Sequence, residues 1–429
     1  MKHIGIVQSA ALSALGVATG FAIWNTSTAW AQDTASPAPV LTFGFDQRFE
    51  YASNATQTAN PARSLQSNTQ LSFGLSDATA RSTFDLTGRT GLRLVDRPAA
   101  SGVDVTMSDP AIALAYTRLG ATARLDIKTG FRINDIAYLR PLTDFANTDG
   151  SIDLPLDFAD LQGSGTRQSL NFDAQLSLRD DAPFGLVLGV AVTDLRYRDV
   201  TDPDLIGNQR LTLRATGRFD IDDVTQLKVG LSYANYVDDD QSSQTLGLNS
   251  GLTITRPDGD LHVSFGLDDA DAGLRSNIGF GRNFDLPNGN FSFDLGFAQS
   301  VDSGVNLTGA LGLTQEFAQG RLTADLRQGL TVGVNDREKL QSALNIRFTQ
   351  DLGPLTSVNL GLAFASSEDV ISGETARTTD LSVSFGYALS PDWRLNAGYS
   401  YRNRDDDLTG QGQDSTVFVG LNRSFEFPL

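Results

Sequence analysis

Between Leu41 and Phe427, apolar residues alternate with polar or small residues, so that every second side chain has the same character. The segment from Phe291 to Ala298, FSFDLGFA, is typical of the whole stretch. A period of two places alternate side chains on opposite faces of a strand. After the N-terminal region we find no stretch with the 3.6-residue period of an amphipathic helix. The pattern therefore predicts an all-β protein.

The second face of each expected strand distinguishes a soluble sandwich from a barrel in a membrane. A soluble sandwich buries one face and exposes charged residues on the other. Here the non-apolar positions are rich in Gly, Ala, Ser, Thr and Asn, with scattered Arg and Asp, and the chain contains 41 glycines. That face suits a crowded, wet interior, and the apolar face suits lipid. Alternating segments of about ten residues separated by turns are typical of transmembrane barrels.

The connections between these segments predict the number of strands. Short turns such as Pro257-Asp258-Gly259 alternate with longer connections such as 366–374. Counting on this basis predicts a single transmembrane, antiparallel, up-and-down β-barrel of about 20 strands, which places both termini on one side of the membrane. About 18 strands is the alternative, because 110–117 and 260–267 are short. The expected strands span 41–51, 65–75, 83–95, 110–117, 121–132, 167–179, 185–197, 208–219, 225–236, 244–256, 260–267, 275–285, 290–299, 305–316, 321–333, 339–350, 355–365, 375–389, 392–403 and 413–425.

The N-terminus has the pattern of a secretory signal. Lys2 and His3 precede an apolar stretch, and Ala29-Trp30-Ala31 fits the small-x-small cleavage pattern. We therefore expect a signal peptide over 1–31, a short periplasmic segment over 32–40 and the barrel over 41–429. An uncleaved membrane anchor is the alternative.

Charge and composition exclude several classes of function. The formal net charge is −18, which argues against nucleic-acid binding. The chain has no cysteine, so disulfide scaffolds and thiolate chemistry are excluded. Because His3 and His262 are the only histidines, the sequence predicts no enzyme, no cofactor and no metal site. The ten longer connections contain 27 acidic and 6 basic residues, so the acidity belongs to the loops rather than to the barrel wall.

Taken together, these features resemble outer-membrane β-barrel proteins of porin type. The resemblance covers 41–427 and is one of pattern. The chain end, Ser424 to Leu429, is similar to the outer-membrane assembly signal, except that Pro428 and Leu429 follow the aromatic Phe427. The resemblance implies the outer membrane of a Gram-negative bacterium, contact with its lipid and lipopolysaccharide, insertion by the barrel assembly machinery, and a homotrimer as one option.

The connection 133–166 is the longest, and it is both acidic and partly apolar. It carries Ile152, Leu154 and Phe158, which are too apolar for a purely solvated loop. The resemblance implies that a long early loop folds into the lumen and constricts it; a lid on the mouth and a disordered external loop are the alternatives. The acidic residues of this connection are Asp135, Asp144, Asp149, Asp153, Asp157 and Asp160.

Basic residues recur in the phase that faces the lumen. A charge on the lipid face would cost about 2–4 kcal/mol at the bilayer midplane, so these side chains are expected inside. Facing an acidic loop, they would create a transverse field that orients solutes. Neutralisation by neighbouring acids, as for Arg124 and Asp126, is the alternative. The predicted pore-lining residues are Arg89, Arg93, Arg124, Lys128, Arg132, Arg210, Arg214, Arg218 and Arg347.

These observations predict an outer-membrane channel for passive diffusion of small hydrophilic solutes. A barrel of about 20 strands is wide enough for an aqueous lumen. One alternative is a pore for polysaccharide export or envelope biogenesis. Another is a structural or adhesive barrel whose lumen is occluded by 133–166.

Overall fold

The chain divides into two units after Ser36, and the description concerns Pro37–Leu429. The computed structural model describes residues 38–57, 62–96, 102–136, 142–145, 147, 151–155, 157–161, 163–202, 205–238, 241–271, 273–302, 304–332, 337–407 and 410–429. The expected signal peptide, 1–31, lies outside the described residues, so its cleavage near Ala31 stays a prediction.

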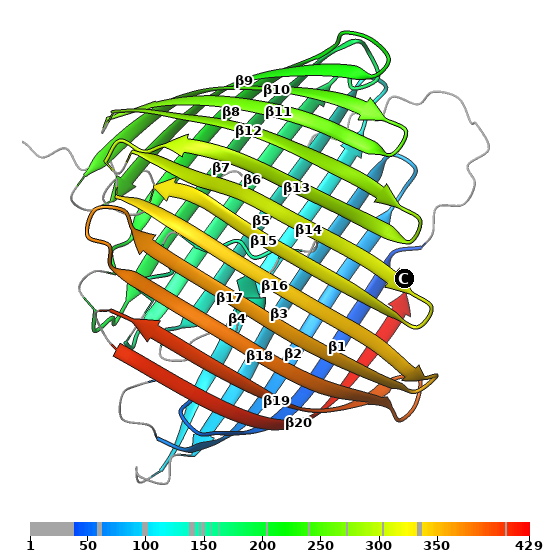
Figure 1. Cartoon of the computed structure of the whole chain (residues 1–429). Coiled ribbons are helices and arrows are strands. Elements are labelled where there is room, and N and C mark those ends of the chain that lie inside the picture. The colour runs from blue at the N-terminus through cyan, green and yellow to red at the C-terminus, as the bar shows by residue number, and fades with distance from the viewer. Residues whose placement is uncertain are drawn as a thin grey trace, which may run out of the picture. The chain divides into compact units, whose positions relative to one another are not determined.

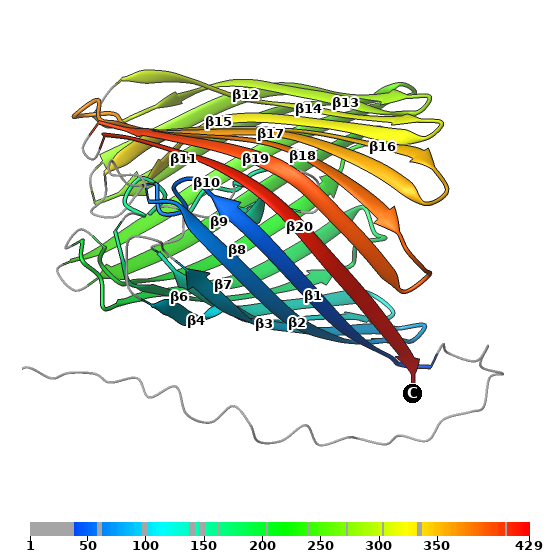
Figure 2. The same cartoon turned by 90° about the horizontal axis from the view of Figure 1, so that it is seen from below.

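Twenty strands form one closed antiparallel barrel (Figure 1). Each strand pairs with its neighbours in the chain, and the first strand pairs with the last, side by side in Figure 2. The strands are β1 (Val40–Ala52), β2 (Ser64–Ala78), β3 (Ser82–Asp96), β4 (Val103–Leu119), β5 (Ala123–Asp135), β6 (Thr166–Leu178), β7 (Phe184–Arg198), β8 (Asn208–Asp220), β9 (Thr225–Asp238), β10 (Ser242–Arg256), β11 (Gly259–Ala270), β12 (Gly273–Leu286), β13 (Gly289–Gln299), β14 (Val305–Phe317), β15 (Gly320–Val332), β16 (Glu338–Gly353), β17 (Thr356–Asp369), β18 (Thr375–Ala388), β19 (Trp393–Asp406) and β20 (Gly410–Pro428). The predicted up-and-down barrel is confirmed, with 20 strands rather than 18.

The largest departure from the predicted strands is at β4, which begins at Val103 rather than at 110. Pro110 lacks a backbone donor, so the sequence here indicates the end of a strand. In the structure the residue before it, Asp109, adopts a φ of 44°. The structure accommodates both residues in a β-bulge, because the pairing register with β3 shifts between Arg89 and Gly91. The residues 103–109 therefore belong to a strand and not to an external connection.

The pairing register separates two faces of the wall. Along β12 and β13, Ile278 pairs with Phe297 on one face, and Gly279 pairs with Gly296 on the other. Ile278 and Phe297 are each 55% exposed on the outside of the barrel, and large apolar side chains are exposed in the same way on strand after strand. An exposed apolar surface of this extent fits lipid rather than water. Among the described residues, no helix has the length and apolar character to cross a membrane.

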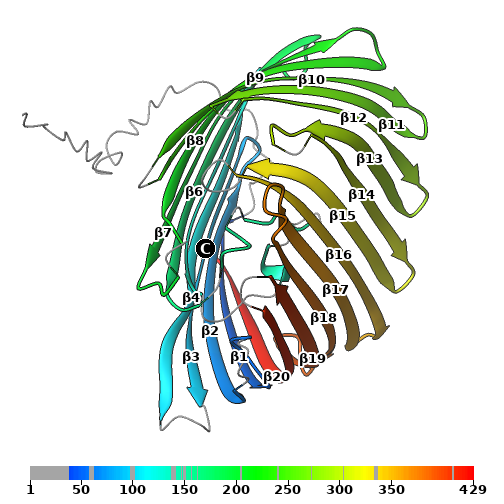
Figure 3. The ribbon, with the colours of Figure 1, turned by 60° about the vertical axis from the view of Figure 1, so that its left-hand side comes forward.

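Part of the connection between β5 and β6 lies inside the barrel. We call this connection, 136–165, the lumen loop. It contains η1 (Leu142–Phe145), a 3₁₀ turn that contacts β17 and β18 and lies within the ring of strands in Figures 1 and 3. The main buried apolar cluster of the described residues forms here, between the lumen loop and the inner face of the wall.

A candidate constriction in the barrel lumen

Apolar packing holds the lumen loop against β16 and β17. Leu142, Ile152, Leu154 and Phe158 are buried, and Phe145 packs beside them. Their partners on the wall are three inward-facing alanines, Ala343, Ala363 and Ala365. Small side chains on the inner face leave the space that the larger loop residues fill. Full burial of one such side chain contributes about 1.5–3 kcal/mol.

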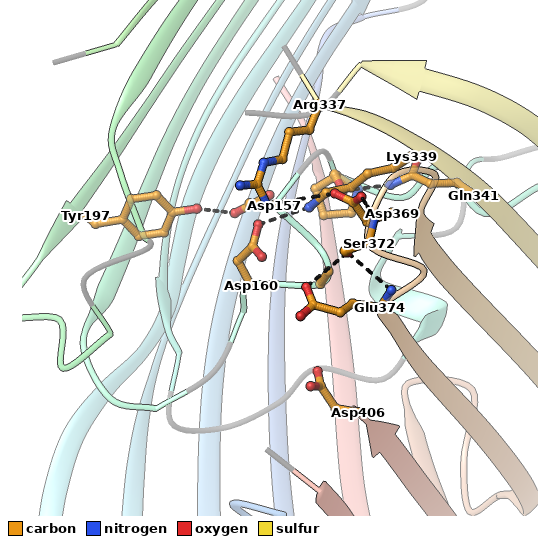
Figure 4. A network of polar contacts seen from close by, with 12 residues as sticks. Asp157, Asp160, Tyr197, Arg337, Lys339, Gln341, Asp369, Ser372, Glu374 and Asp406 are labelled. Carbon is orange, nitrogen blue, oxygen red and sulfur yellow. Dashed lines mark hydrogen bonds and ion pairs between the residues drawn. The ribbon is translucent and has the colours of Figure 1, made fainter. Parts of the chain in front are cut away.

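On the β6 and β7 side, the loop is held through Asp157, which is 3% exposed. Arg167 of β6 donates two hydrogen bonds to its carboxylate, at 2.6 and 2.9 Å. The Tyr197 hydroxyl of β7 donates a third (Figure 4). A buried carboxylate with a bidentate arginine is a geometry in which charge and hydrogen bonding are both satisfied.

The opposite wall holds the same loop through other groups. The Lys339 ammonium of β16 lies 3.3 Å from the Asp160 carboxylate, and Gln341 donates to the Pro155 carbonyl (Figure 4). Arg404 of β19 donates to the carbonyls of Leu161 and Ala159, at 3.1 and 2.9 Å. Since β6 and β16 are half the circumference apart, the loop joins two facing parts of the wall.

The start of η1 is tied to the wall as well. The backbone N–H of Leu142 donates to the Asp380 carboxylate of β18, which is 9% exposed. Arg402 of β19 donates to the other oxygen of Asp380 at 3.0 Å. Packing, ion pairs and backbone hydrogen bonds together therefore fix the loop inside the lumen.

The residues 53–57, which follow β1, also lie against the inner face of the wall. The backbone N–H of Asn54 donates to Asp414 of β20 at 2.8 Å, and the Ser53 hydroxyl donates to the same carboxylate. Gln57 follows, with its backbone N–H bonded to the Asn54 carbonyl. A side chain at Gly412 would overlap the Gln57 carbonyl, so only glycine lets the connection lie against β20 here.

The six predicted loop acids have different environments. Asp157 and Asp160 bind the wall, whereas Asp153 is exposed. Asp135 is the last residue of β5, so the connection is shorter than the predicted 133–166. The Asp144 side chain and all of Asp149 lie outside the described residues.

The nine predicted basic residues all occupy inward positions in the pairing register, opposite in phase to the exposed apolar residues. Arg124 pairs with Asp126, Arg93 lies 3.6 Å from Asp109, and Arg218 lies 3.5 Å from Asp220. For these three residues, local neutralisation describes the surroundings best. Their role in permeation stays a prediction, as does that of the other six.

A cavity of about 870 Å³ adjoins two of the predicted residues, Arg89 and Arg132. Inward-facing Asp46, Gln70 and Arg394 also line it. Within the part of the chain that the structure describes, Arg89, Lys128, Arg214 and Arg347 have no carboxylate within 4.0 Å. These four side chains therefore bring positive charge to the lumen without a direct ion pair.

The wall residues that hold the loop were not among those predicted. Arg167, Tyr197, Lys339, Asp380 and Arg404 all lie in the inward phase of their strands. The sequence places Arg404 in an external connection, because the acidic run that follows it is typical of a loop. The sequence feature that could have identified these residues is a charged or polar side chain in the inward phase near the end of a strand.

One more hydrogen-bonded pair of side chains lies on the inner face. His262 of β11 contacts the Asp294 carboxylate of β13 across Gly281 of β12, which has no side chain to separate them. Among the described residues, no group of three or more His, Cys, Asp or Glu side chains is arranged to hold a metal ion.

Comparisons with known proteins concern the fold. No protein-family model matches the chain, and no curated protein matches it. Two variant structures of the ferric enterobactin receptor PfeA from Pseudomonas aeruginosa are similar, both at 10% sequence identity. The TM-scores are 0.52 and 0.51, covering 92% and 90% of this chain and 81% and 80% of the receptor. The outer membrane protein opdK from the same organism matches at a TM-score of 0.40 and 11% identity, over 90% of this chain and 99% of that one. The closed barrel and its similarity to the receptor show that this chain has the fold of outer-membrane β-barrel proteins.

Proposed function

We propose that the protein is an outer-membrane channel for passive diffusion of small hydrophilic solutes, narrowed by the lumen loop. The observation that carries the proposal is the loop itself, which is packed on Ala343, Ala363 and Ala365 and bonded to two facing walls. The inner face is otherwise small and polar, as an aqueous passage requires. The exposed apolar outer face supports placement in a lipid bilayer, with membrane lipid, lipopolysaccharide and the assembly machinery as partners.

A second candidate is favoured by the same loop. If its contacts close the lumen, the barrel is occluded and serves a structural or adhesive role. Burial of Leu142 to 1% exposure and of Asp157 to 3% supports a loop that stays in place. The two candidates differ in whether water and ions pass the loop.

Conductance in planar lipid bilayers separates these candidates. The full chain is compared with a variant in which 142–161 is replaced by a short Gly-Ser linker. A channel shows steady conductance in the full chain, and the variant conducts more and changes its reversal potential in a salt gradient. An occluded barrel shows conductance only in the variant. Zero conductance from both proteins, with circular dichroism showing intact barrels, would contradict both candidates.

A further inference from the structure

A small cavity lies where the two inward-folded connections meet the wall. It measures about 40 Å³. The apolar part of its lining comes from Ile136, Leu142, Phe145, Phe158 and Leu161. Because one water molecule needs about 10–15 Å³ of such space, the cavity holds about three waters or a solute group of about three non-hydrogen atoms.

Gln57 lines this cavity with an amide that nothing in the described structure satisfies. The residue is 9% exposed, and neither its Nε2 nor its Oε1 has a hydrogen-bond partner. The Nε of Arg404, which also lines the cavity, is a further buried donor without a partner. A buried polar group left without a partner costs about 1–3 kcal/mol. Gln57 also holds a φ of 48°, a region that residues other than glycine rarely adopt.

The charges around the cavity select the kind of group that fits. Arg167, Arg402 and Arg404 line it, and each is paired with a carboxylate, at 2.6, 3.0 and 3.3 Å. Asp135 is the one acidic residue of the lining that the structure describes. Because each of the three arginines already has a carboxylate partner, a solute carboxylate would meet no arginine of the lining that lacks an ion pair. It would also leave the Gln57 Oε1 without a donor.

From this geometry we infer that the cavity is a solute-binding subsite for an uncharged group that both donates and accepts hydrogen bonds, as a primary carboxamide does, attached to an apolar body. The solute amide accepts from Gln57 Nε2 and Arg404 Nε, and it donates to Gln57 Oε1. The amide group fills the cavity beside Phe145, Phe158 and Leu161, and the apolar body to which it is attached extends out of the cavity into the lumen. The inference deepens the proposed function, on which it rests for the route that brings solute to the constriction, and it names the class of solute held there.

Binding of benzamide to the full chain in detergent tests the inference without requiring conduction. Benzoate serves as the matched ligand, with the same ring and a carboxylate in place of the amide. We expect benzamide to bind the unaltered protein about tenfold more tightly than benzoate does, and Gln57→Leu to weaken benzamide about tenfold. Saturation-transfer NMR measures both affinities.

A control variant tests the specificity of the effect. Gln66 of β2 is also a buried, inward-facing glutamine, but its amide bonds to Ser64 and it lies outside the cavity. Gln66→Leu should leave benzamide affinity unchanged. Should Gln57→Leu fail to fold, Gln57→Glu keeps the side-chain length and is expected to weaken benzamide through the added charge.

Three results would overturn the inference: equal benzamide affinity in Gln57→Leu and the unaltered protein, benzoate binding as tightly as benzamide, or a crystal structure soaked in benzamide that shows ordered water only in the cavity. The outcome is separable from that of the proposed function. Benzamide binding without bilayer conductance would contradict the proposed channel and support the subsite. Conductance without benzamide binding would support the channel and contradict the subsite.

Discussion

Two parts of the barrel wall face the same lumen with different side chains. On β16–β19 the inward positions combine small alanines with charged groups such as Lys339, Asp380 and Arg404, and the lumen loop packs there. On β10–β14 the inward positions are mostly glycine, serine, threonine and asparagine. We call these the packed wall and the small-residue wall.

The difference between the two walls shows that the alternation of apolar and polar residues determines only which side chains face the lumen. What occupies the lumen depends on the size and charge of the inward residues. Small residues next to charged anchors hold a loop, whereas small residues without such anchors leave the wall open to water. Solutes are therefore expected to pass along the small-residue wall, and the predictions below test this division.

The largest effect is expected for Asp157→Ala. The substitution removes the carboxylate that pairs with Arg167, whose side chain is only 15% exposed, and leaves that guanidinium without its partner. Removing one member of a buried pair costs about 3–5 kcal/mol. The free energy of unfolding, measured by urea titration in lipid, should fall by about this amount.

Asp153→Ala is the control for Asp157→Ala. Asp153 lies in the same loop but is exposed, so its removal should change the free energy of unfolding by less than about 0.5 kcal/mol. Equal losses in the two variants would show that the loop tolerates no change anywhere and that the Arg167 contact has no special weight.

A phenylalanine on the packed wall should lower stability, whereas one on the small-residue wall should lower conductance. Ala363 is 2% exposed in the packed cluster, so Ala363→Phe should lower the free energy of unfolding by about 1–3 kcal/mol through overpacking. A Cβ added at Gly251 would meet only the Val263 carbonyl, at 3.8 Å, so Gly251→Phe should fold and instead narrow the passage. Single-channel conductance should fall clearly in Gly251→Phe.

One outcome would contradict the proposed passage along the small-residue wall. If Gly251→Phe conducts like the unaltered protein, solutes do not pass the small-residue wall, and the proposed difference between the walls is wrong for transport. The stability result for Ala363→Phe would still test the packing of the loop.

Alanine substitutions at two inward-facing glycines compare a crowded position of the wall with an open one. At Gly281 an added Cβ would overlap His262 and Asp294, whereas at Gly329 it meets nothing within 4 Å. Gly281→Ala should cost about 1 kcal/mol of unfolding free energy. Gly329→Ala should be neutral or gain about 0.5 kcal/mol, because alanine has less backbone freedom to lose than glycine. Equal changes in unfolding free energy would mean that His262 and Asp294 move aside for the added Cβ without a measurable cost.

Most of the fold could be predicted from the sequence because each strand carries its own alternation. Every one of the twenty expected strands is present, and the one large boundary error, at β4, comes from Pro110 within a bulge. Local pattern is enough for a wall in which each strand contacts its chain neighbours.

The position of the lumen loop could be predicted only in outline. The apolar residues of the long loop indicated packing, but its partners lie far along the chain: Asp160 meets Lys339, and Leu142 meets Asp380. Alternation places those residues inside without saying which ones meet. Gln57 carried no signal at all, because its burial depends on two connections that fold inward together.

The smallest effect concerns the outer edge of the packed wall, where Asp407 follows β19. Its carboxylate accepts hydrogen bonds from the backbone N–H and the hydroxyl of Thr375, at 2.9 and 3.0 Å. Both hydrogen bonds favour the ionised carboxylate and hold the pKa of Asp407 below its usual range. The bond from the backbone N–H has the larger effect. Because the folded pKa is the lower one, the stabilisation is present above the unfolded pKa of about 3.9 and is lost as pH falls through the folded pKa. The chemical shift of the Thr375 amide should therefore titrate with a midpoint below 3.9, and Asp407→Asn should abolish that titration. A midpoint at or above about 3.9 would mean that the hydrogen bonds from Thr375 do not hold the Asp407 carboxylate at this edge.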